Sequence, residues 1–442
     1  MKFGRIVTIA ALIAHITNIC TLNCEQEKNL FNTLQISMQI PGTWISDWNT
    51  WTRDLNTLGA LTHERNYIRT MQYTDRALFN AFPGLHAIDH ISLCALPTQI
   101  EKLEALSTHY NQQIYIKRDD MTGGIDAKGN PKYGGNKRRK LEFLAGQALA
   151  HGATDWITYG CAGSNHALCT SFIAQELGCK AHCMLAPQPN SSVVQQNLLL
   201  HLIAGSDLNY YYARSFRCAK TILMWTDLYH TTGKFPYIIP IGGSNEVGAL
   251  GFVNAAFELK QQIDQGILPK PARIYVACGS CATSVGLALG CTLAGLDSTI
   301  VAVSVQPEDE LDMYKKNMRV LTDKIIQHMQ SYDASVPAIT FDDLSLELCT
   351  NFCGPDYGVF TPEGRNAMEI MKEMERCNLE GTYTAKACAA LLDDLQNNKI
   401  KDNEPVLFWN TYYGIMNQDQ LRTVSYKQLP EQFHTYFEKS IQ

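Results

Sequence analysis

Short apolar runs alternate with longer segments of helical periodicity along the chain from about residue 140 onward. Each apolar run has the length of a buried strand, and each longer segment repeats its apolar residues at helical spacing. This alternation is typical of an α/β protein whose parallel sheet is covered by helices on both faces. The pattern predicts strands at Asp155–Tyr159, Ala181–Leu185, Pro236–Pro240 and Arg273–Ala277, and helices at Ala167–Leu177, Ser191–Ala204, Phe216–Tyr229, Phe252–Gln265 and Ser284–Leu293.

A lysine stands at the start of a further predicted helix, directly after a glycine turn. In the stretch Tyr133–Leu144, Gly134 and Gly135 precede Lys137. Glycine permits a tight turn and the close approach of a ligand, and the free amides at a helix start favour an anion. A basic surface turn is the alternative interpretation. The helix is predicted to be amphipathic, from its apolar residues Leu141, Leu144, Ala145, Ala148 and Leu149.

The composition favours a globular protein that acts on small molecules. A chain of 442 residues with 45% hydrophobic residues can bury a large core, and its length suggests two or more lobes. The net charge is only -6, and no basic stripe interleaved with aromatic residues indicates nucleic-acid binding. A small-molecule ligand is therefore the default expectation.

The chain has 15 cysteines, scattered through predicted helices and strands. An odd number in a chain of this length does not resemble the disulfide framework of a small secreted domain, so most are expected to be buried hydrophobic residues. Cys278 and Cys281 form a C-x-x-C motif. Because they lack a second pair with zinc-finger spacing, no metal site is predicted.

The N-terminal residues differ from the rest of the chain. Lys2 and Arg5 precede the apolar run Ile6–Ile16, which resembles a signal peptide and is short for a membrane span. Residues 1–24 are thus a possible targeting segment, whereas the many cysteines favour a reducing compartment, so export and a cytoplasmic location both stay open. Residues 25–94 form an extension that is too aromatic for a disordered tail and is expected to pack on the main body.

Several motifs occur together in a fixed order. Besides 133–144, they are Ile116–Thr122, Gly163–His166, Pro240–Asn245, Gly248–Phe252, Gly279–Thr283, Gly354–Gly358 and Tyr383–Ala387. This set resembles the pyridoxal-phosphate enzymes related to D-cysteine desulfhydrase and 1-aminocyclopropane-1-carboxylate deaminase, in the tryptophan-synthase-β-like fold group. The resemblance covers roughly residues 95–414 and is far more specific than any single motif.

The resemblance implies a two-lobed enzyme of fold type II, with parallel-rich open sheets covered by helices and the cofactor between the lobes. Residues 95–139 and 249–442 would form the large cofactor-binding domain, and residues 140–248 the small domain. The family also implies a homodimer.

The cofactor residues are implied by the same resemblance. Lys137 matches the lysine that binds the cofactor covalently and later removes the substrate's α-proton. Burial beside Lys140 and Arg138 is expected to keep its amine neutral. Lys140 and Asn165 match positions that reach the phosphate. The turn expected to hold the phosphate, between a strand and a helix, comprises Gly279, Ser280, Cys281, Ala282 and Thr283.

Two positions bear on the substrate. Thr384 matches the partner of the pyridine nitrogen, where a hydroxyl suits an unprotonated ring and a carboxylate would hold it protonated. The cyclopropane deaminases have glutamate there and leucine at the position of Thr411, whereas the D-cysteine desulfhydrases have a small hydroxyl residue in place of the glutamate. Both positions therefore favour a desulfhydrase-like enzyme.

The remaining site residues match the substrate side of the family's pocket. Tyr383 matches a tyrosine against the cofactor ring, and Tyr357 one that lines the substrate pocket, although isolated tyrosines are more often packing residues. Ser164, Asn165 and His166 match the loop that binds the substrate carboxylate, with Ser164 also able to handle a proton. A helix N-cap is an alternative or additional role for Ser164 or Asn165.

The chain departs from the family at several glycines, which makes the substrate less certain than the cofactor. Many relatives have two glycines at Cys281 and Ala282, and a glycine pair at Tyr412 and Tyr413. The expected function is β-elimination from a small amino acid, above all D-cysteine, giving pyruvate, ammonia and hydrogen sulfide. The alternatives are 1-aminocyclopropane-1-carboxylate deamination and a cofactor-binding protein without turnover.

Overall fold

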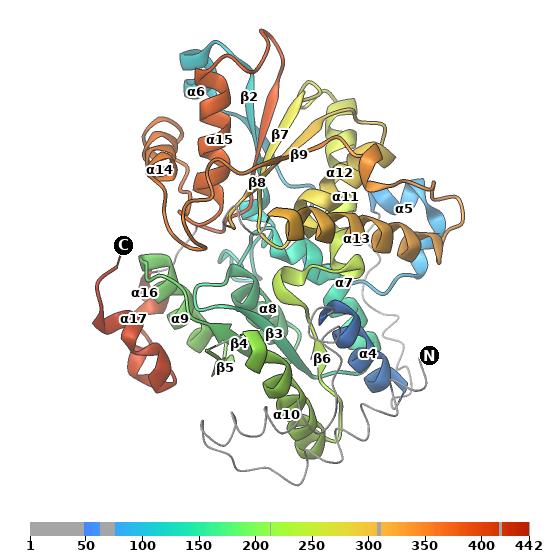
Figure 1. Ribbon diagram of the computed structural model, residues 1–442, viewed down its shortest axis with the longest axis vertical. Coiled ribbons are helices and arrows are strands. Elements are labelled where there is room, and N and C mark those ends of the chain that lie inside the picture. Colours follow the sequence, from blue (N-terminus) through green and yellow to red (C-terminus); the bar gives the residue numbers. More distant parts are fainter. Residues whose placement is uncertain (1–47, 62–75, 213, 307–310, 415–417, 442) are drawn as a thin grey trace.

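The computed structural model describes residues 48–61, 76–212, 214–306, 311–414 and 418–441 (Figure 1). The possible targeting segment, residues 1–24, lies outside this part of the chain. Among the described helices, none has both the length and the apolar character needed to span a bilayer. Two sheets form the framework, and they occupy opposite halves of the molecule in Figure 1.

The larger sheet has six strands in the order β1-β2-β10-β7-β8-β9. Only the edge strand β1 runs antiparallel to its neighbour, and the other pairs are parallel. The predicted α/β class with parallel-rich sheets is therefore confirmed. The strands are β1 (Ile100–Lys102), β2 (Ile114–Arg118), β7 (Arg273–Cys278), β8 (Thr299–Ser304), β9 (Leu346–Cys349) and β10 (Val406–Asn410).

Helices cover both faces of this sheet, because alternate residues of each strand point to opposite sides. In β7, Tyr275 and Ala277 pack against one helical layer, and Ile274 and Val276 against the other. The first layer consists of α6 (Glu104–Tyr110), α14 (Pro362–Glu375) and α15 (Thr384–Gln396); the second consists of α7 (Lys137–Ala150), α11 (Glu246–Asp264), α12 (Ala282–Leu293) and α13 (Leu311–Gln330).

The smaller sheet has four parallel strands in the order β5-β4-β3-β6. Trp156 of β3 faces the main core, whereas Ile157 and Tyr159 pack with Trp225 in a separate cluster. The elements are β3 (Asp155–Cys161), α8 (Asn165–Glu176), β4 (Lys180–Ala186), α9 (Ser192–Ile203), β5 (Asp207–Tyr210), α10 (Arg214–Thr232) and β6 (Tyr237–Ile238).

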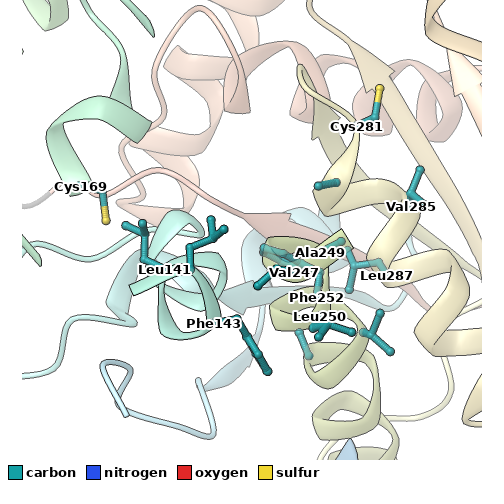
Figure 2. Packing of buried hydrophobic residues seen from close by; sticks show 14 of the residues in the cluster. Leu141, Phe143, Cys169, Val247, Ala249, Leu250, Phe252, Cys281, Val285 and Leu287 are labelled. Atoms are coloured by element: carbon teal, nitrogen blue, oxygen red, sulfur yellow. The ribbon is translucent and has the colours of Figure 1, made fainter. Parts of the chain in front are cut away.

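Helix α7 connects the two halves and is buried on nearly all sides, which corrects the expectation of an amphipathic helix. Its apolar residues Leu141 and Phe143 pack in the same core cluster as α11 and α12 (Figure 2). Three of its charged residues are buried with ionic partners: Arg138 pairs with Glu176, Arg139 with Asp119 and Glu258, and Glu142 with Arg76. Buried charges require such partners.

The described parts of the N-terminal extension pack on both halves. In α4 (Trp48–Leu61), the Asn56 side-chain amide pairs with the backbone of Ile238 in β6, donating to its carbonyl at 2.9 Å and accepting from its N–H at 2.8 Å. The amide of Leu78, in α5 (Ala77–Ala81), instead donates to the Asn254 side chain of α11 at 3.2 Å.

Short elements complete the fold. The C-terminal segment returns to the small sheet, where α16 and α17 contact α9. The remaining helices are η1 (Pro83–Ala87), η2 (Asp119–Met121), η3 (Ile241–Gly243), η5 (Phe341–Asp343), α16 (Gln418–Leu421), η6 (Tyr426–Gln428), η7 (Glu431–Phe433) and α17 (Thr435–Glu438).

Candidate active site

A cavity of about 650 Å³ takes its walls from both halves of the molecule. The ends of β3 and β7 reach it, at Cys161 and Cys278. Ligands of open α/β sheets bind at the carboxyl ends of the strands, as here. Most of the predicted site residues line the cavity: Lys137, Ser164, Asn165, His166, Gly279, Ser280, Cys281, Thr283, Tyr357, Tyr383 and Thr411.

Lys137 is the first residue of α7, and its position is fixed by the turn before it. Gly135 has a φ of +89°, which favours glycine, and its carbonyl accepts a 2.8 Å hydrogen bond from the Thr122 hydroxyl. Burial lowers the pKa of the Lys137 amine to about 8. A neutral amine is therefore accessible near physiological pH. Arg138 does not contribute as expected, because its guanidinium turns away to Glu176.

The turn before α12 has the form expected for an anion site. Cys281 precedes the helix, and helix α12 starts at Ala282 beside the cavity, so its first amides carry the positive end of the helix dipole. The Ser280 hydroxyl lies in the wall and accepts a 2.6 Å hydrogen bond from Ser244. The side-chain amide of Asn136 donates to Thr283 at 3.2 Å, which ties the lysine turn to this helix start.

Two residues assigned to the phosphate do not lie in the cavity wall. Ala282 is buried inside the first turn of α12, and its amide already donates to the carbonyl of Ser280 at 3.0 Å. Lys140 lies one helical turn beyond Lys137, and its amine donates to the Gly242 carbonyl at 3.1 Å. Burial and the neighbouring Lys137 hold the pKa of Lys140 well below its usual value.

The loop 163–166 meets the cavity at the start of α8. Ser164 is the N-cap, since its hydroxyl accepts from the amide of Ala167 at 3.2 Å. This confirms the alternative role expected for it. The Asn165 side chain is held by Asn197, whose amide donates to it at 2.9 Å. Burial, with Lys137 and Lys140, lowers the pKa of His166 well below its usual value, so its imidazole is neutral.

Two tyrosine hydroxyls meet in the cavity. The Tyr357 and Tyr383 oxygens are 2.6 Å apart. Burial raises the pKa of both phenols, so both are protonated near neutral pH. Such a pair can donate a proton to a bound ligand.

Thr384, the expected partner of the ring nitrogen, is fully buried and absent from the cavity wall. Its hydroxyl accepts from the Glu380 amide at 2.9 Å and donates to the Glu380 carbonyl at 3.3 Å. The Glu380 side chain does line the cavity, and its carboxylate accepts from the amides of Thr382, Tyr383 and Thr384 at 2.6 to 2.9 Å. Burial raises the pKa of Glu380.

Sequence reasoning missed several residues of the wall. For Glu380, an acidic residue shortly before a helix start was an available capping signal. The others come from loops and helices whose approach depends on the packed fold. They include Asn136, Gln188, Tyr211, Tyr212, Arg217, Ser284, Gln306, Tyr314 and Asp356.

Comparison with known proteins places this site in a family. Residues 91–411 match the model of the pyridoxal-phosphate dependent enzyme family. The chain is 32% identical over 334 residues to a D-cysteine desulfhydrase from Klebsiella pneumoniae subsp. pneumoniae, with 74% of this chain and 95% of that protein covered.

Solved structures agree with this assignment. A crystal structure of an ACC deaminase homologue, 29% identical, superposes with a TM-score of 0.63 over 79% of this chain and 99% of its own. The processed form of threonine deaminase isoform 2 from Solanum lycopersicum shares the fold, with a TM-score of 0.51 at 19% identity over 82% of this chain and 96% of its own. The chain therefore belongs to the pyridoxal-phosphate dependent enzymes, with a fold of type II.

Proposed function

We propose that this enzyme is a lyase that eliminates the β-substituent of a small amino acid, with D-cysteine as its main substrate. The observation that carries the proposal is the meeting, in one cavity, of a half-buried lysine of lowered pKa and a pair of protonated tyrosines. A base for the α-proton and an acid for the leaving group are what β-elimination requires. The activity of the D-cysteine desulfhydrase relative supports the choice of substrate.

The cavity suits pyridoxal phosphate. In this proposal, the α12 start at Gly279–Thr283 would hold the phosphate with its amides, Lys137 would bind the cofactor covalently, and Tyr383 would contact its ring. A side chain added at Gly279 would come within 3.0 Å of the Tyr383 ring, so the turn and this tyrosine already pack closely. When bound, the cofactor supplies the electron sink for charge that develops at the substrate's α-carbon.

The protein side chains handle the protons. The Lys137 amine takes the α-proton, for which its pKa of about 8 is well matched to neutral pH. The Tyr357–Tyr383 pair gives a proton to the sulfur as the bond between carbon and sulfur breaks, so hydrogen sulfide leaves. Water then replaces the amino group, and the products are pyruvate and ammonia.

The start of α8 orients the substrate. Its amides and the Ser164 hydroxyl would bind the substrate carboxylate, with Asn165 fixed by Asn197 and a neutral His166 beside them. To contact the ring nitrogen, the buried Thr384 hydroxyl would have to give up its 3.3 Å hydrogen bond to the Glu380 carbonyl and become exposed to the cavity, whose wall it does not form in this structure. Lys140, whose amine donates to the Gly242 carbonyl, would support the phosphate site from outside the cavity wall.

The lobe boundaries and the assembly also belong to this proposal. Residues 95–139 and 249–442 would form the large lobe, from which α16 and α17 reach across to α9 of the small sheet, residues 140–248 would form the small lobe, and two chains would form a homodimer. Light scattering of the purified protein gives its molar mass and so tests directly whether it is a dimer.

One assay series tests the proposal. The purified enzyme is offered D-cysteine, L-cysteine, D-serine, β-chloro-D-alanine and 1-aminocyclopropane-1-carboxylate, and sulfide, pyruvate and 2-oxobutyrate are measured. We expect sulfide and pyruvate in equal amounts from D-cysteine. Release of 2-oxobutyrate from the cyclopropane would support the deaminase alternative. The similarity of this chain to the ACC deaminase homologue is the reason for including that substrate. A yellow protein that turns over none of these compounds would contradict the lyase proposal.

A further inference from the structure

The turn proposed for the phosphate carries two cysteines. Cys278 is the last residue of β7, and Cys281 immediately precedes α12. Their sulfur atoms are 4.0 Å apart, and both residues line the cavity while being almost fully buried. A C-x-x-C motif between a strand and a helix start is the arrangement of dithiol redox sites.

The backbone at Cys281 argues against simple packing. Its φ is +69°, a conformation that favours glycine. A cysteine therefore occupies a strained position that glycine would adopt freely, at the start of α12 (Figure 2). Strained residues of this kind occur where a side chain has a chemical task.

The surroundings make Cys278 the more reactive of the two thiols. The Ser284 hydroxyl donates to the Cys278 sulfur at 3.3 Å. The hydrogen bond between the two sulfurs is the main cause that lowers the pKa of Cys278, and the same bond, together with burial, raises the pKa of Cys281. The thiolate is the nucleophile in thiol oxidation, so Cys278 reacts first.

We propose that Cys278 and Cys281 form a reversible disulfide, and that this bond and a bound phosphate group exclude each other. Hydrogen peroxide transfers one oxygen to the Cys278 thiolate, which gives a sulfenic acid and one water after protonation. The Cys281 sulfur then displaces the second water as the bond between the sulfurs forms. The two sulfurs lose two electrons and the peroxide gains them. A dithiol reverses the reaction.

The disulfide and a bound phosphate exclude each other for geometric reasons, and this part of the inference rests on the proposed phosphate site. A disulfide has a bond length of about 2.05 Å, so the sulfurs must approach by roughly 2 Å from their present 4.0 Å. This movement draws Cys281 toward β7 and changes the turn whose amides would bind phosphate. A phosphate held there would in turn cover both sulfurs on the cavity side.

The test maps the disulfide in the full-length protein. Holoenzyme and enzyme freed of its cofactor are treated with hydrogen peroxide, the latter with and without added pyridoxal phosphate or inorganic phosphate, and free thiols are then alkylated. Mass spectrometry of the tryptic fragment 274–315 scores Cys278 and Cys281, and Cys291 in the same fragment is an internal control. We expect a Cys278–Cys281 disulfide that forms several-fold more slowly with phosphate present, releases the cofactor, and is reversed by dithiothreitol.

Variants make the result decisive. Cys161→Ser, on the same cavity wall, should still form the disulfide, and Cys281→Gly should keep its cofactor through peroxide treatment. Sulfinic or sulfonic acid at Cys278 without a disulfide, or equal rates with and without phosphate, would overturn the proposal. The mass measurement needs no turnover, so an enzyme that forms this disulfide but lacks lyase activity refutes only the proposed function.

Discussion

The hydroxyl of Tyr357 lies 2.6 Å from the hydroxyl of Tyr383, although the two residues come from different segments of the large half. Burial raises the pKa of both groups, so the pair is fully protonated when the Lys137 amine begins to lose its proton. The cavity can thus hold an acid and a base together near neutral pH.

Replacing Tyr357 with Phe should slow elimination by about 10²- to 10⁴-fold in kcat, the usual contribution of a general acid, with little change in KM. Tyr383→Phe should have a similar effect, and the double variant should be no slower than the worse single variant, because the two hydroxyls act as one donor. Steady-state kinetics with D-cysteine measure all three. Additive losses would contradict a shared role.

The lysine turn makes a prediction about pH. With a pKa of about 8, the neutral fraction of the Lys137 amine rises about tenfold per pH unit below that value and levels off above it. After removal of the cofactor, the rate at which added pyridoxal phosphate becomes fixed by borohydride should follow this curve. Lys137→Ala should abolish the adduct, and a labelled peptide containing Lys140 or Lys386 instead would refute the assignment.

The sequence was sufficient for most elements between residues 155 and 293, although not for β5 (Asp207–Tyr210), because strands and helices leave local signals. Between residues 155 and 293, the predicted elements occur with shifted ends, and the largest shift is at α11. That helix starts at Glu246 instead of Phe252, since the Asn245 side chain accepts from the amide of Gly248 at 2.9 Å and caps it. Capping by a side chain three residues away is easily overlooked within a glycine-rich stretch.

The site was less predictable. Motifs identified Lys137 and the two tyrosines, which lie in the cavity. They also suggested Thr384 as a pocket residue, whereas the structure buries it behind Glu380. Whether a residue of a first helical turn faces a cavity depends on the angle at which the helix meets the sheet, and that angle is set by long-range packing.

The C-terminal segment is expected to tune substrate binding, although it lies beyond the family match at 91–411. The Tyr436 hydroxyl accepts from the Gln188 amide at 3.0 Å, and the Gln188 side chain accepts from the Gly163 amide at 2.9 Å. Tyr436 therefore positions the loop that carries Ser164. Loss of one hydrogen bond costs about 1 kcal/mol, so Tyr436→Phe should raise KM about fivefold.

The control for this prediction is Tyr426→Phe, because Tyr426 stacks on Phe437 in the same C-terminal segment. Its KM should match that of the unchanged enzyme. A fall in kcat for Tyr436→Phe at constant KM would show that the segment acts on a later step than substrate binding.

Stability should depend on pH through His182 in the small sheet. Its two ring nitrogens lie 2.9 Å from carboxylate oxygens of Asp155 and Asp207. Burial opposes protonation of the ring, but the hydrogen bonds to both carboxylates outweigh it and raise the pKa of His182. The hydrogen bond to His182 is in turn the largest cause that lowers the pKa of each aspartate.

The signs of these shifts define the pH window. Stabilisation by the raised pKa of His182 is complete below about pH 6.5 and is lost as the pH rises through the folded-state pKa of the imidazole. Stabilisation by the lowered pKa values of the two aspartates is present above about pH 3.9 and is lost as the pH falls below that value. His182→Gln should therefore lower the thermal unfolding midpoint most between about pH 4 and 6.5, and much less at about pH 9. His230→Gln, an exposed histidine on α10, is the matched control. If His182→Gln lowers the thermal unfolding midpoint equally inside this pH window and at about pH 9, the imidazole contributes by packing and not by its charge.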